Sequence, residues 1–397
     1  MNIKKDFPVF NDSSLVYLDS CSSTQKPKYV IDAISEHLSS WYANIHRWLY
    51  DLSDISQELY DKSKKIVWKH LWVKASEVVY TYNSTYAFNI LAYSLYFSNY
   101  LKKWDKILLS IAEHHSNIVP WLSLQEKFWI QVEFVQNDDN GDIDMQDFNN
   151  KYDETVKLVS FNYVSNVTWT IFDLKKIWSI LRDDTLFVID WSQAVPNFPV
   201  NFDDLWADFL VFTWHKLMAN TWIWVLIWKK DHLKKINSIF AWWGSIKDVN
   251  TQWYELLLWA EWFEAWTPNI SWAVSLLKAF EYIESIWWFD KVWQKEQELT
   301  KYMLDWFLQR ENKIELIGKK TPDNRLWVFS FVLKWDFSPI RFGEHMAMKN
   351  ICIRCGGHCA HPYLKSMWYA WSCRASLYLY NDFSDIDRFF YAIDEFI

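Results

Sequence analysis

Glycine is scarce in this chain, which has six glycines among 397 residues, whereas average usage is roughly 7 %. A chain of this length is expected to form two or three domain-sized units with a substantial core, which argues against a small fold stapled by disulfides or metal. The turns between its elements need residues that tolerate a positive φ. Some other residue type must therefore serve in those turns.

Cysteine, positive charge and long apolar runs are also limited. The cysteines at positions 21, 352, 355, 359 and 373 are odd in number and form a poor disulfide framework, so we expect a reducing compartment, the cytoplasm by default. The net charge of −8 argues against nucleic-acid and anionic-lipid partners. The longest apolar run, residues 222–228, is far shorter than the ~18 residues of a membrane span. The N-terminus lacks the apolar segment of a signal peptide, so small-molecule chemistry away from membranes is favoured.

Tryptophan, by contrast, is abundant, with 30 residues. Trp104, Trp287 and Trp327 stand where turns or helix ends favour a residue that tolerates a positive φ. Our hypothesis is that UGA, read here as tryptophan, encodes glycine in the source organism. Genuine tryptophan enrichment is the alternative. Together the two residue types make up about 9 % of the chain, close to an ordinary glycine content.

Short apolar segments alternate with helical patterns over the first two thirds of the chain. Helical patterns cover residues 26–42, 84–95 and 173–181, and the apolar segments are 78–81, 107–111, 158–164, 186–189, 209–213 and 223–227. Such alternation predicts a mostly parallel sheet covered by helices on both faces. From about residue 271 the pattern changes to helices, at 273–286 and 294–310, followed by a strand at 327–333. We therefore predict an α/β fold with a large domain (22–270), a smaller α+β C-terminal domain (271–397) and an N-terminal segment (1–21) that packs with the small domain.

Polar residues follow five of the predicted strands, where ligands bind in such sheets. These residues are Asn83, Ser84 and Thr85; Glu113, His114 and His115; Ser165 and Asn166; Asp190, Ser192 and Gln193; and Thr213, His215 and Lys216. Hydroxyls at a helix start suit a phosphate, a carboxylate suits a protonated ring nitrogen, and a lysine can form a Schiff base. Taken singly, an Asp at a strand end is more often a helix cap and a His more often a core residue, so the order and spacing of the set carry the prediction.

Five segments resemble group II cysteine desulfurases, which belong to the class V aminotransferase family of fold type I pyridoxal-phosphate enzymes, alongside the selenocysteine lyases. The segments are Glu113–Trp121, Val188–Val195, Thr213–Leu217, Phe263–Asn269 and Cys373–Ser376. The resemblance extends from Tyr17 to the final helix. Tryptophan stands where that family has glycine at positions 41, 48, 104, 169, 191, 214, 222, 224, 266 and 327, whereas Trp121 matches a family tryptophan.

The resemblance implies pyridoxal 5′-phosphate as the cofactor and assigns the residues that hold it. Lys216 would form the Schiff base, His114 would stack on the ring and exchange protons, and Asp190 would pair with the ring nitrogen. Gln193 and Asn166 would address the phenolic oxygen. The phosphate would be held by Ser84, Thr85, Thr213 and His215, and by Thr267 of a second copy, which implies a homodimer. We also expect the indoles of Trp191 and Trp214, if literal, to block this site and weaken cofactor binding.

The resemblance also implies the substrate, L-cysteine, and a sulfur-accepting residue. Arg374 would clamp the substrate carboxylate, a task suited to a planar guanidinium, while Asn166, Arg354 and His46 would line the mouth. The loop at residues 354–362 resembles the active-site loop of group II enzymes, with Cys359 as the nucleophile. Cysteine would become alanine, and Cys359 would carry the sulfur as a persulfide for iron–sulfur cluster assembly or another acceptor protein.

Other interpretations stay open. Cys352, Cys355 and Cys359 with two histidines could bind zinc, although strand-like alternation predicts that Cys352 points into the core; Cys21 and Cys373 are predicted to be buried small apolar residues. Within the fold, a selenocysteine lyase or a cysteine-sulfinate desulfinase is the alternative. A non-catalytic scaffold is a further class, and the joint presence of the catalytic set argues against it.

Overall fold

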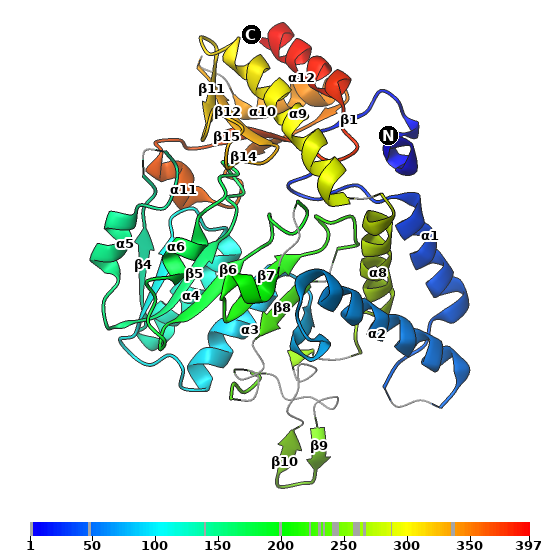
Figure 1. Ribbon diagram of the computed structural model, residues 1–397, viewed down its shortest axis with the longest axis vertical. Coiled ribbons are helices and arrows are strands. Elements are labelled where there is room, and N and C mark those ends of the chain that lie inside the picture. Colours follow the sequence, from blue (N-terminus) through cyan, green and yellow to red (C-terminus); the bar gives the residue numbers. More distant parts are fainter. Residues whose placement is uncertain are drawn as a thin grey trace.

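The computed structural model describes residues 3–397 apart from 47–48, 139, 198–200, 222–223, 229–231, 233–234, 240–245, 257–262, 265–266, 287 and 335–337. A seven-stranded sheet crosses the larger part of the molecule (Figure 1). Its strands, in spatial order, are β2 (Val78–Thr81), β8 (Trp224–Trp228), β7 (Phe209–Thr213), β6 (Leu186–Asp190), β5 (Val156–Asn162), β3 (Lys106–Ser110) and β4 (Gln131–Val135). Pairing is parallel from β7 to β4, and β8 runs antiparallel to both of its neighbours. The prediction of a mainly parallel sheet is confirmed.

Helices cover both faces of this sheet because the central strands are apolar on both sides. Leu158, Val188 and Val211 belong to one core, which they share with α3 (Ser84–Phe97) and α4 (Val119–Phe128). Val159 and Ile189 belong to the other, which they share with α6 (Leu174–Trp178). Strands buried on both faces read as continuous apolar runs in the sequence.

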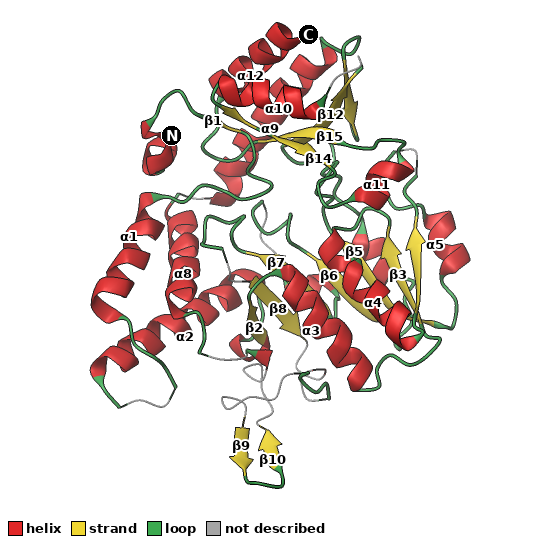
Figure 2. Ribbon diagram, turned by 180° about the vertical axis from the view of Figure 1, so that it is seen from behind, coloured by secondary structure: helices red, strands yellow, loops and turns green. Residues whose placement is uncertain are grey.

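The smaller unit is an antiparallel sheet with helices packed on it (Figure 2). Its strand order is β11 (Ile314–Ile317), β12 (Val328–Leu333), β15 (Ser372–Ser376) and β14 (Arg354–Gly356). Its helices are α9 (Trp288–Leu308), α10 (Pro339–Met348), α11 (His361–Ser366) and α12 (Phe383–Phe396). Near the N-terminus, β1 (Val16–Tyr17) pairs in parallel with β13 (Ile351–Cys352), so this segment lies against the smaller unit.

The remaining elements pack around these two sheets. Helix α8 (Ile270–Ser285) lies against α1 (Lys28–Glu36) and α2 (Asp51–Leu71), and α1 continues into a π-helical turn, η3 (His37–Trp41). The others are α5 (Met145–Lys151), the hairpin of β9 (Ile246–Val249) and β10 (Tyr254–Leu256), and the short 3₁₀ turns η1 (Ile3–Asp6), η2 (Pro8–Asn11), η4 (Ala75–Glu77), η5 (His115–Asn117) and η6 (Phe202–Leu205). Within the described ranges, no helix combines the length and the apolar character needed to cross a membrane.

Thirteen non-glycine residues in the described part of the chain have a positive φ, and six of them are tryptophans. The six are Trp72, Trp104, Trp129, Trp169, Trp206 and Trp368, with φ values of 56°, 75°, 66°, 51°, 49° and 67°. Two of them, Trp72 and Trp129, end α2 and α4 in the left-handed conformation that favours glycine. The expectation for Trp104 therefore agrees with the backbone. Trp48, Trp222, Trp266 and Trp287, for which the sequence also suggested a glycine position, lie outside the described residues.

Trp327 does not follow this pattern, and the expectation of a positive φ there is wrong. Its side chain is fully buried, and its Nε1 donates a hydrogen bond to Asn197 Oδ1 at 2.9 Å. Trp121 is also fully buried, and its Nε1 donates to Asn117 Oδ1 at 2.9 Å. These two indoles are packed and paired, unlike the exposed indole of Trp72.

Replacing Trp72 by glycine is expected to stabilise the protein by about 1 kcal/mol, because a left-handed residue with a Cβ is strained by roughly that amount. The matched control is Trp68→Gly, an exposed position inside the same helix, where glycine lowers stability by about 1 kcal/mol. Urea unfolding midpoints measure both changes. A Trp72→Gly midpoint below that of the unmodified chain would contradict the prediction.

Candidate active site

A cavity of about 130 Å³ lies at the carboxyl ends of β5, β6 and β7. The three strands are paired in parallel, so their last residues reach the same edge of the sheet. The cavity is lined by Cys21, Ser22, Ser84, His114, Ser116, Asn162, Val164, Asn166, Asp190, Ser192, Gln193, Thr213, His215, Lys216, Arg354, His358 and Arg374. Most of the residues predicted for the site are therefore gathered around one space, and Cys359, Thr85, Thr267 and His46 are not among its walls.

Asp190 and Lys216 both line this cavity and interact electrostatically with each other. Asp190 ends β6 and is buried, and its Oδ1 accepts a hydrogen bond from the backbone N–H of Ser192 at 2.9 Å. Burial raises the pKa of Asp190, while Ser192 and the charge of Lys216 oppose the rise. Burial lowers the pKa of Lys216 from its ordinary value, while Cys21 and Asp190 act in the opposite direction. Lys216 therefore loses its proton more readily than a surface lysine, and its neutral amine can act as a nucleophile or a base.

His114 is held as a neutral imidazole beside the pair. Its Nδ1 accepts a hydrogen bond from the backbone N–H of Ser116 at 3.2 Å and lies 2.8 Å from Ser116 Oγ. A backbone N–H can only donate, so Nδ1 is the acceptor and the ring proton sits on Nε2. Burial, followed by the charge of Lys216, lowers the pKa of His114 to about 3. The imidazole is thus uncharged at neutral pH and can lie flat against an aromatic ring.

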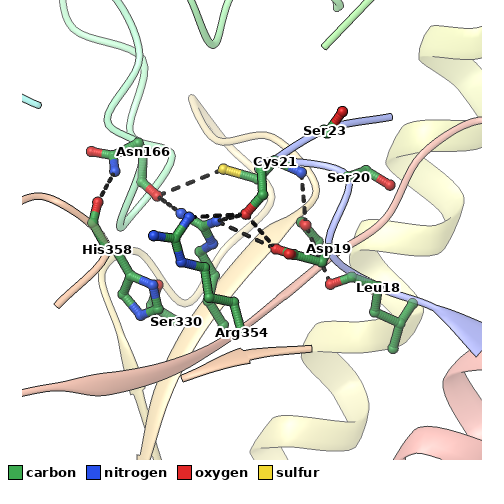
Figure 3. A network of polar contacts seen from close by, with 12 residues as sticks. Leu18, Asp19, Ser20, Cys21, Ser23, Asn166, Ser330, Arg354 and His358 are labelled. Atoms are coloured by element: carbon green, nitrogen blue, oxygen red, sulfur yellow. Dashed lines mark hydrogen bonds and ion pairs between the residues drawn. The ribbon is translucent and has the colours of Figure 1, made fainter. Parts of the chain in front are cut away.

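Arg354 and Arg374 both line the cavity and converge on the hydroxyl of Ser22. Figure 3 shows Arg354 in this polar network, together with Asp19 and Asn166. Arg354 Nη1 and Arg374 Nη2 both donate to Ser22 Oγ, at 3.1 and 2.9 Å, and Ser22 Oγ donates to Asp19 Oδ1 at 2.6 Å. Arg374 Nη1 also donates to the Asn166 carbonyl oxygen at 2.9 Å, and its Nη2 lies 3.5 Å from Asp19 Oδ1. Ser22 therefore uses one donor and two acceptor positions, which fully occupies a hydroxyl. The arrangement places two guanidinium groups in the cavity wall, a chemistry that suits an anion.

The Cys359 loop is anchored beside these arginines. Arg354 Nη2 donates to Cys359 Sγ at 3.8 Å, and the backbone N–H of His115 donates to the Cys359 carbonyl oxygen at 2.8 Å. Cys359 is half-buried and has a φ of 56°. At Gly357, a Cβ would collide with the ring of His361, so a larger residue there would have to displace that exposed side chain. Cys359, the nucleophile predicted from the sequence, therefore lies next to the cavity and directly follows His358, a residue of its wall.

His358 fills the space between this loop and the sheet. Its Nε2 lies 3.0 Å from the Ser372 carbonyl oxygen, which can only accept, so the ring proton is on Nε2. The His358 carbonyl oxygen accepts a hydrogen bond from Asn166 Nδ2 at 2.7 Å. Burial lowers the pKa of His358 to about 2, so the ring is neutral.

Three predicted residues lie away from the cavity of this chain. Thr85 is exposed on the first turn of α3, whereas Ser84 beside it lines the cavity. Thr267 is exposed, as is His46, whose backbone N–H donates to Gln57 Oε1 at 2.9 Å. Their assignments remain predictions.

Several residues of the cavity wall had no site role predicted from the sequence. Cys21 is buried as expected, but it also lines the cavity, and its Sγ donates to the Asn166 carbonyl oxygen at 3.8 Å. Ser22, Ser116, Asn162, Ser192 and His358 were likewise not assigned a role, although each of the last four flanks a predicted residue or a strand end. Cys352 is half-buried rather than in the core. Among the described residues, no group of three His, Cys, Asp or Glu side chains converges as metal ligands.

Neither Trp191 nor Trp214 lines the cavity, so their indoles do not form part of its walls. The expected weakening of cofactor binding stays a prediction. Trp191 packs on Tyr163 with ring centroids 4.2 Å apart, and Trp214 packs edge-on against Phe212 and Phe280 at 4.5 and 4.9 Å. Both side chains are buried in the hydrophobic core. The Nε1 of Trp214 has no hydrogen-bond partner in the part of the chain that the structure describes.

Buried polar atoms without partners show what the cavity would hold. In the described ranges these atoms include Thr213 Oγ1, Ser192 Oγ, Gln193 Oε1, Asn166 Oδ1 and Arg374 Nε. Buried polar groups are normally paired, so this set calls for a polar ligand. Hydroxyls suit a phosphate, Asp190 suits a protonated ring nitrogen, and Lys216 supplies an amine for a covalent link. The residues present fit pyridoxal phosphate.

Comparisons with known proteins agree with this fit. The family model described as aminotransferase class-V matches residues 16–389. A protein of Pyrococcus abyssi named "Probable cysteine desulfurase" is 31 % identical over 398 residues, covering 100 % of this chain and 97 % of that protein. A protein of the same name from Halalkalibacterium halodurans is 32 % identical over 396 residues, covering 97 % and 95 %.

A solved structure gives the same result in three dimensions. The apo structure of a cysteine desulfurase from Thermococcus onnurineus NA1 superposes with a TM-score of 0.93 at 30 % identity, covering 100 % of this chain and 97 % of that one. Since the family match spans nearly the whole chain and these proteins align with it from end to end, the chain belongs to the class-V aminotransferase family and is a pyridoxal-phosphate-dependent enzyme.

Proposed function

We propose that the protein is a cysteine desulfurase, which converts L-cysteine to L-alanine and transfers the sulfur to Cys359. The observation that carries the proposal is the meeting of three groups at one cavity: the Lys216–Asp190 pair, the two guanidinium groups of Arg354 and Arg374, and the Cys359 loop. Whole-length relatives named as cysteine desulfurases support the same activity.

The residues around the cavity divide the work of holding the cofactor. Lys216 would bind it covalently, Asp190 would pair with its ring nitrogen, and the neutral His114 would stack on its ring. Ser84, Thr213 and His215 would hold its phosphate, at the start of α3 and the end of β7. Pyridoxal phosphate, when bound, supplies an electron-withdrawing ring that stabilises the charge left on the substrate Cα after its proton leaves.

Arg374 is the proposed partner of the substrate carboxylate. Its guanidinium is buried and fixed by the Asn166 carbonyl and Ser22 Oγ, so the group is already oriented before substrate arrives. Its Nε, without a partner among the described residues, is free to donate to a carboxylate oxygen. Lys216, whose pKa is lowered by burial, would then accept the Cα proton.

Cys359 is the proposed sulfur acceptor. Its thiolate would attack the sulfur of the bound cysteine, the bond between sulfur and Cβ would break, and the two sulfurs would remain joined as a persulfide. Protonation of the carbon skeleton would give alanine. The hydrogen bond that Arg354 Nη2 donates to Cys359 Sγ would hold this sulfur beside the cavity.

The wider setting belongs to the same proposal. The persulfide would pass to an acceptor protein, in iron–sulfur cluster assembly or another sulfur pathway, in the cytoplasm. The exposed Thr267 would reach the phosphate site of a second copy in a homodimer. A selenocysteine lyase, a cysteine-sulfinate desulfinase and a non-catalytic scaffold are the competing interpretations that the following experiments separate.

Lys216→Ala is expected to lower alanine release from L-cysteine by at least about 10²-fold, because it removes both the covalent anchor and the proton acceptor. The assay uses the cofactor-loaded protein, and Lys28→Ala, an exposed position on α1, is the control that keeps full activity. Equal background release from the parent and the Lys216 variant would favour the scaffold.

Cys359→Ser is expected to abolish alanine release from L-cysteine, because a hydroxyl cannot take the sulfur as a persulfide. The same variant should retain activity on selenocysteine if the fold's lyase chemistry is intact. Cys352→Ser is the control, since Cys352 is half-buried on β13, outside the cavity wall. Undiminished release from L-cysteine by Cys359→Ser would argue for a different reaction.

Ser22→Ala is expected to raise KM for L-cysteine about tenfold while changing kcat less, because two charge-assisted hydrogen bonds that orient Arg354 and Arg374 are lost. Ser23→Ala in the same turn is the matched control, since the nearest contact of Ser23 Oγ to the site is 3.4 Å from the His215 carbonyl oxygen. Steady-state kinetics separate the two constants. A KM equal in both variants would show that Ser22 does not position the arginines.

A further inference from the structure

Cys355 and Cys373 stand directly opposite each other in the sheet of the smaller unit. They are register partners in the antiparallel pair of β14 and β15, and their Sγ atoms are 2.7 Å apart. Opposed residues in an antiparallel pair have Cα atoms about 4.5–5.5 Å apart, and a disulfide tolerates about 4.4–6.8 Å. The backbone therefore already has the geometry that a bond between these two sulfurs needs.

The two cysteines lie on the face of the sheet opposite the arginines of the cavity wall. Arg354 and Arg374 are the adjacent register partners and line the cavity. Side chains alternate along a strand, so the two cysteines point to the other face. There, a Cβ placed on Gly343 of α10 would be 3.9 Å from Cys355 Sγ. The thiols are consequently separate from the site that holds substrate and cofactor.

The two thiols differ in access. Cys355 is partly exposed, whereas Cys373 is fully buried. Burial, together with the neighbouring Cys355, raises the pKa of the Cys373 thiol. An oxidant arriving from solvent therefore meets Cys355 first, and Cys373 is positioned to react with the oxidised sulfur.

We propose that Cys355 and Cys373 form a redox-modification site, in which a hydroperoxide converts the two thiols into a cross-strand disulfide. The Cys355 thiolate attacks the peroxide O–O bond, gains one oxygen as a sulfenic acid and releases an alcohol or water. The Cys373 sulfur then attacks Cys355 Sγ, and the sulfenic oxygen leaves as water. In total, two thiols lose two electrons and two protons, and the peroxide is reduced by the same two electrons.

The bond would fix the strand that carries the Cys359 loop. β14 has three residues and is an edge strand held by β15 alone within its sheet. The strand ends at Gly356, and Gly357 then leads to His358 and Cys359. A link at Cys355 keeps Arg354 in register with Arg374, so oxidation stabilises the base of the loop rather than dismantling the site.

The test exposes the cofactor-loaded protein to hydrogen peroxide, alkylates the remaining thiols and maps the peptides by mass spectrometry. The expected product is a linked pair of peptides containing Cys355 and Cys373, two hydrogens lighter than the separate peptides and released by dithiothreitol. Oxidation should also raise the thermal midpoint by about 2–4 °C, since the bond closes a loop of the unfolded chain.

Variants distinguish this site from the other cysteines. Cys355→Ser and Cys373→Ser should each lose both the linked peptides and the thermal shift, whereas Cys352→Ser and Cys359→Ser should keep them. Because Cys373 is buried, its replacement can disturb folding. Cys355→Ser changes a partly exposed position and tests the same disulfide without that risk. Oxidation of Cys359 shows that the peroxide has acted. If Cys355 and Cys373 can both still be alkylated at that point, or if Cys355 is linked to a different cysteine, the proposal is wrong.

Discussion

The in-register parallel pairing of β5, β6 and β7 is the constraint on which the site depends. Asn162 at the end of β5 is the register partner of Asp190 at the end of β6, and Asp190 is in turn paired with Val211. This places Thr213 two residues further along β7, at the same edge. A one-residue slip in a strand would turn its side chains to the other face, and Asp190 would leave the cavity. Because each strand is apolar and buried on both faces, the two cores set this register.

Residues 22–26 of the N-terminal segment link the two units of the molecule, because they bind side chains of the smaller unit and backbone of the larger one. Ser22 binds Arg354 and Arg374 of the smaller unit, while Thr24 donates from its backbone N–H and from Oγ1 to the His215 carbonyl oxygen, at 3.1 and 3.0 Å. Lys26 Nζ donates to the same carbonyl oxygen at 3.1 Å. The residue before Lys216 and the two arginines of the cavity wall are thus tied to one stretch of five residues. Movement of this segment would displace the amine and the guanidinium groups together.

Much of the fold could be predicted because the central strands are buried on both faces and therefore appear in the sequence as continuous apolar runs. The segments expected at 78–81 and 209–213 coincide with β2 and β7, and the polar groups after the strands reached one cavity. β4 was missed because it is an edge strand, half-buried over most of its length, so Gln131–Val135 lacks a continuous apolar run. The last expected strand of the large sheet proved antiparallel, since strand direction depends on the connection and not on composition. Cys21 and Ser22 were missed because their contacts join residues more than 140 positions apart, and no local pattern encodes such proximity.

The tryptophans separate into two groups according to what the backbone demands. At Trp72 and Trp129 the chain must turn left-handed to end a helix, a requirement that holds whatever side chain is attached, and both indoles extend into solvent. At Trp121 and Trp327 the backbone makes no such demand, and each indole is buried with its N–H paired. Trp214 fits neither group: it is fully buried and packed against two phenylalanines, yet in the described structure its N–H has no partner, which costs about 1–3 kcal/mol. A glycine at 214 would remove that unpaired donor and leave a cavity in its place. The positive φ values at helix ends and turns are therefore the observations that agree most directly with the hypothesis that UGA encodes glycine. At a buried position such as Trp214, glycine would remove the unpaired N–H but also the packing of the indole, and the larger of these two free energies decides which residue is more stable.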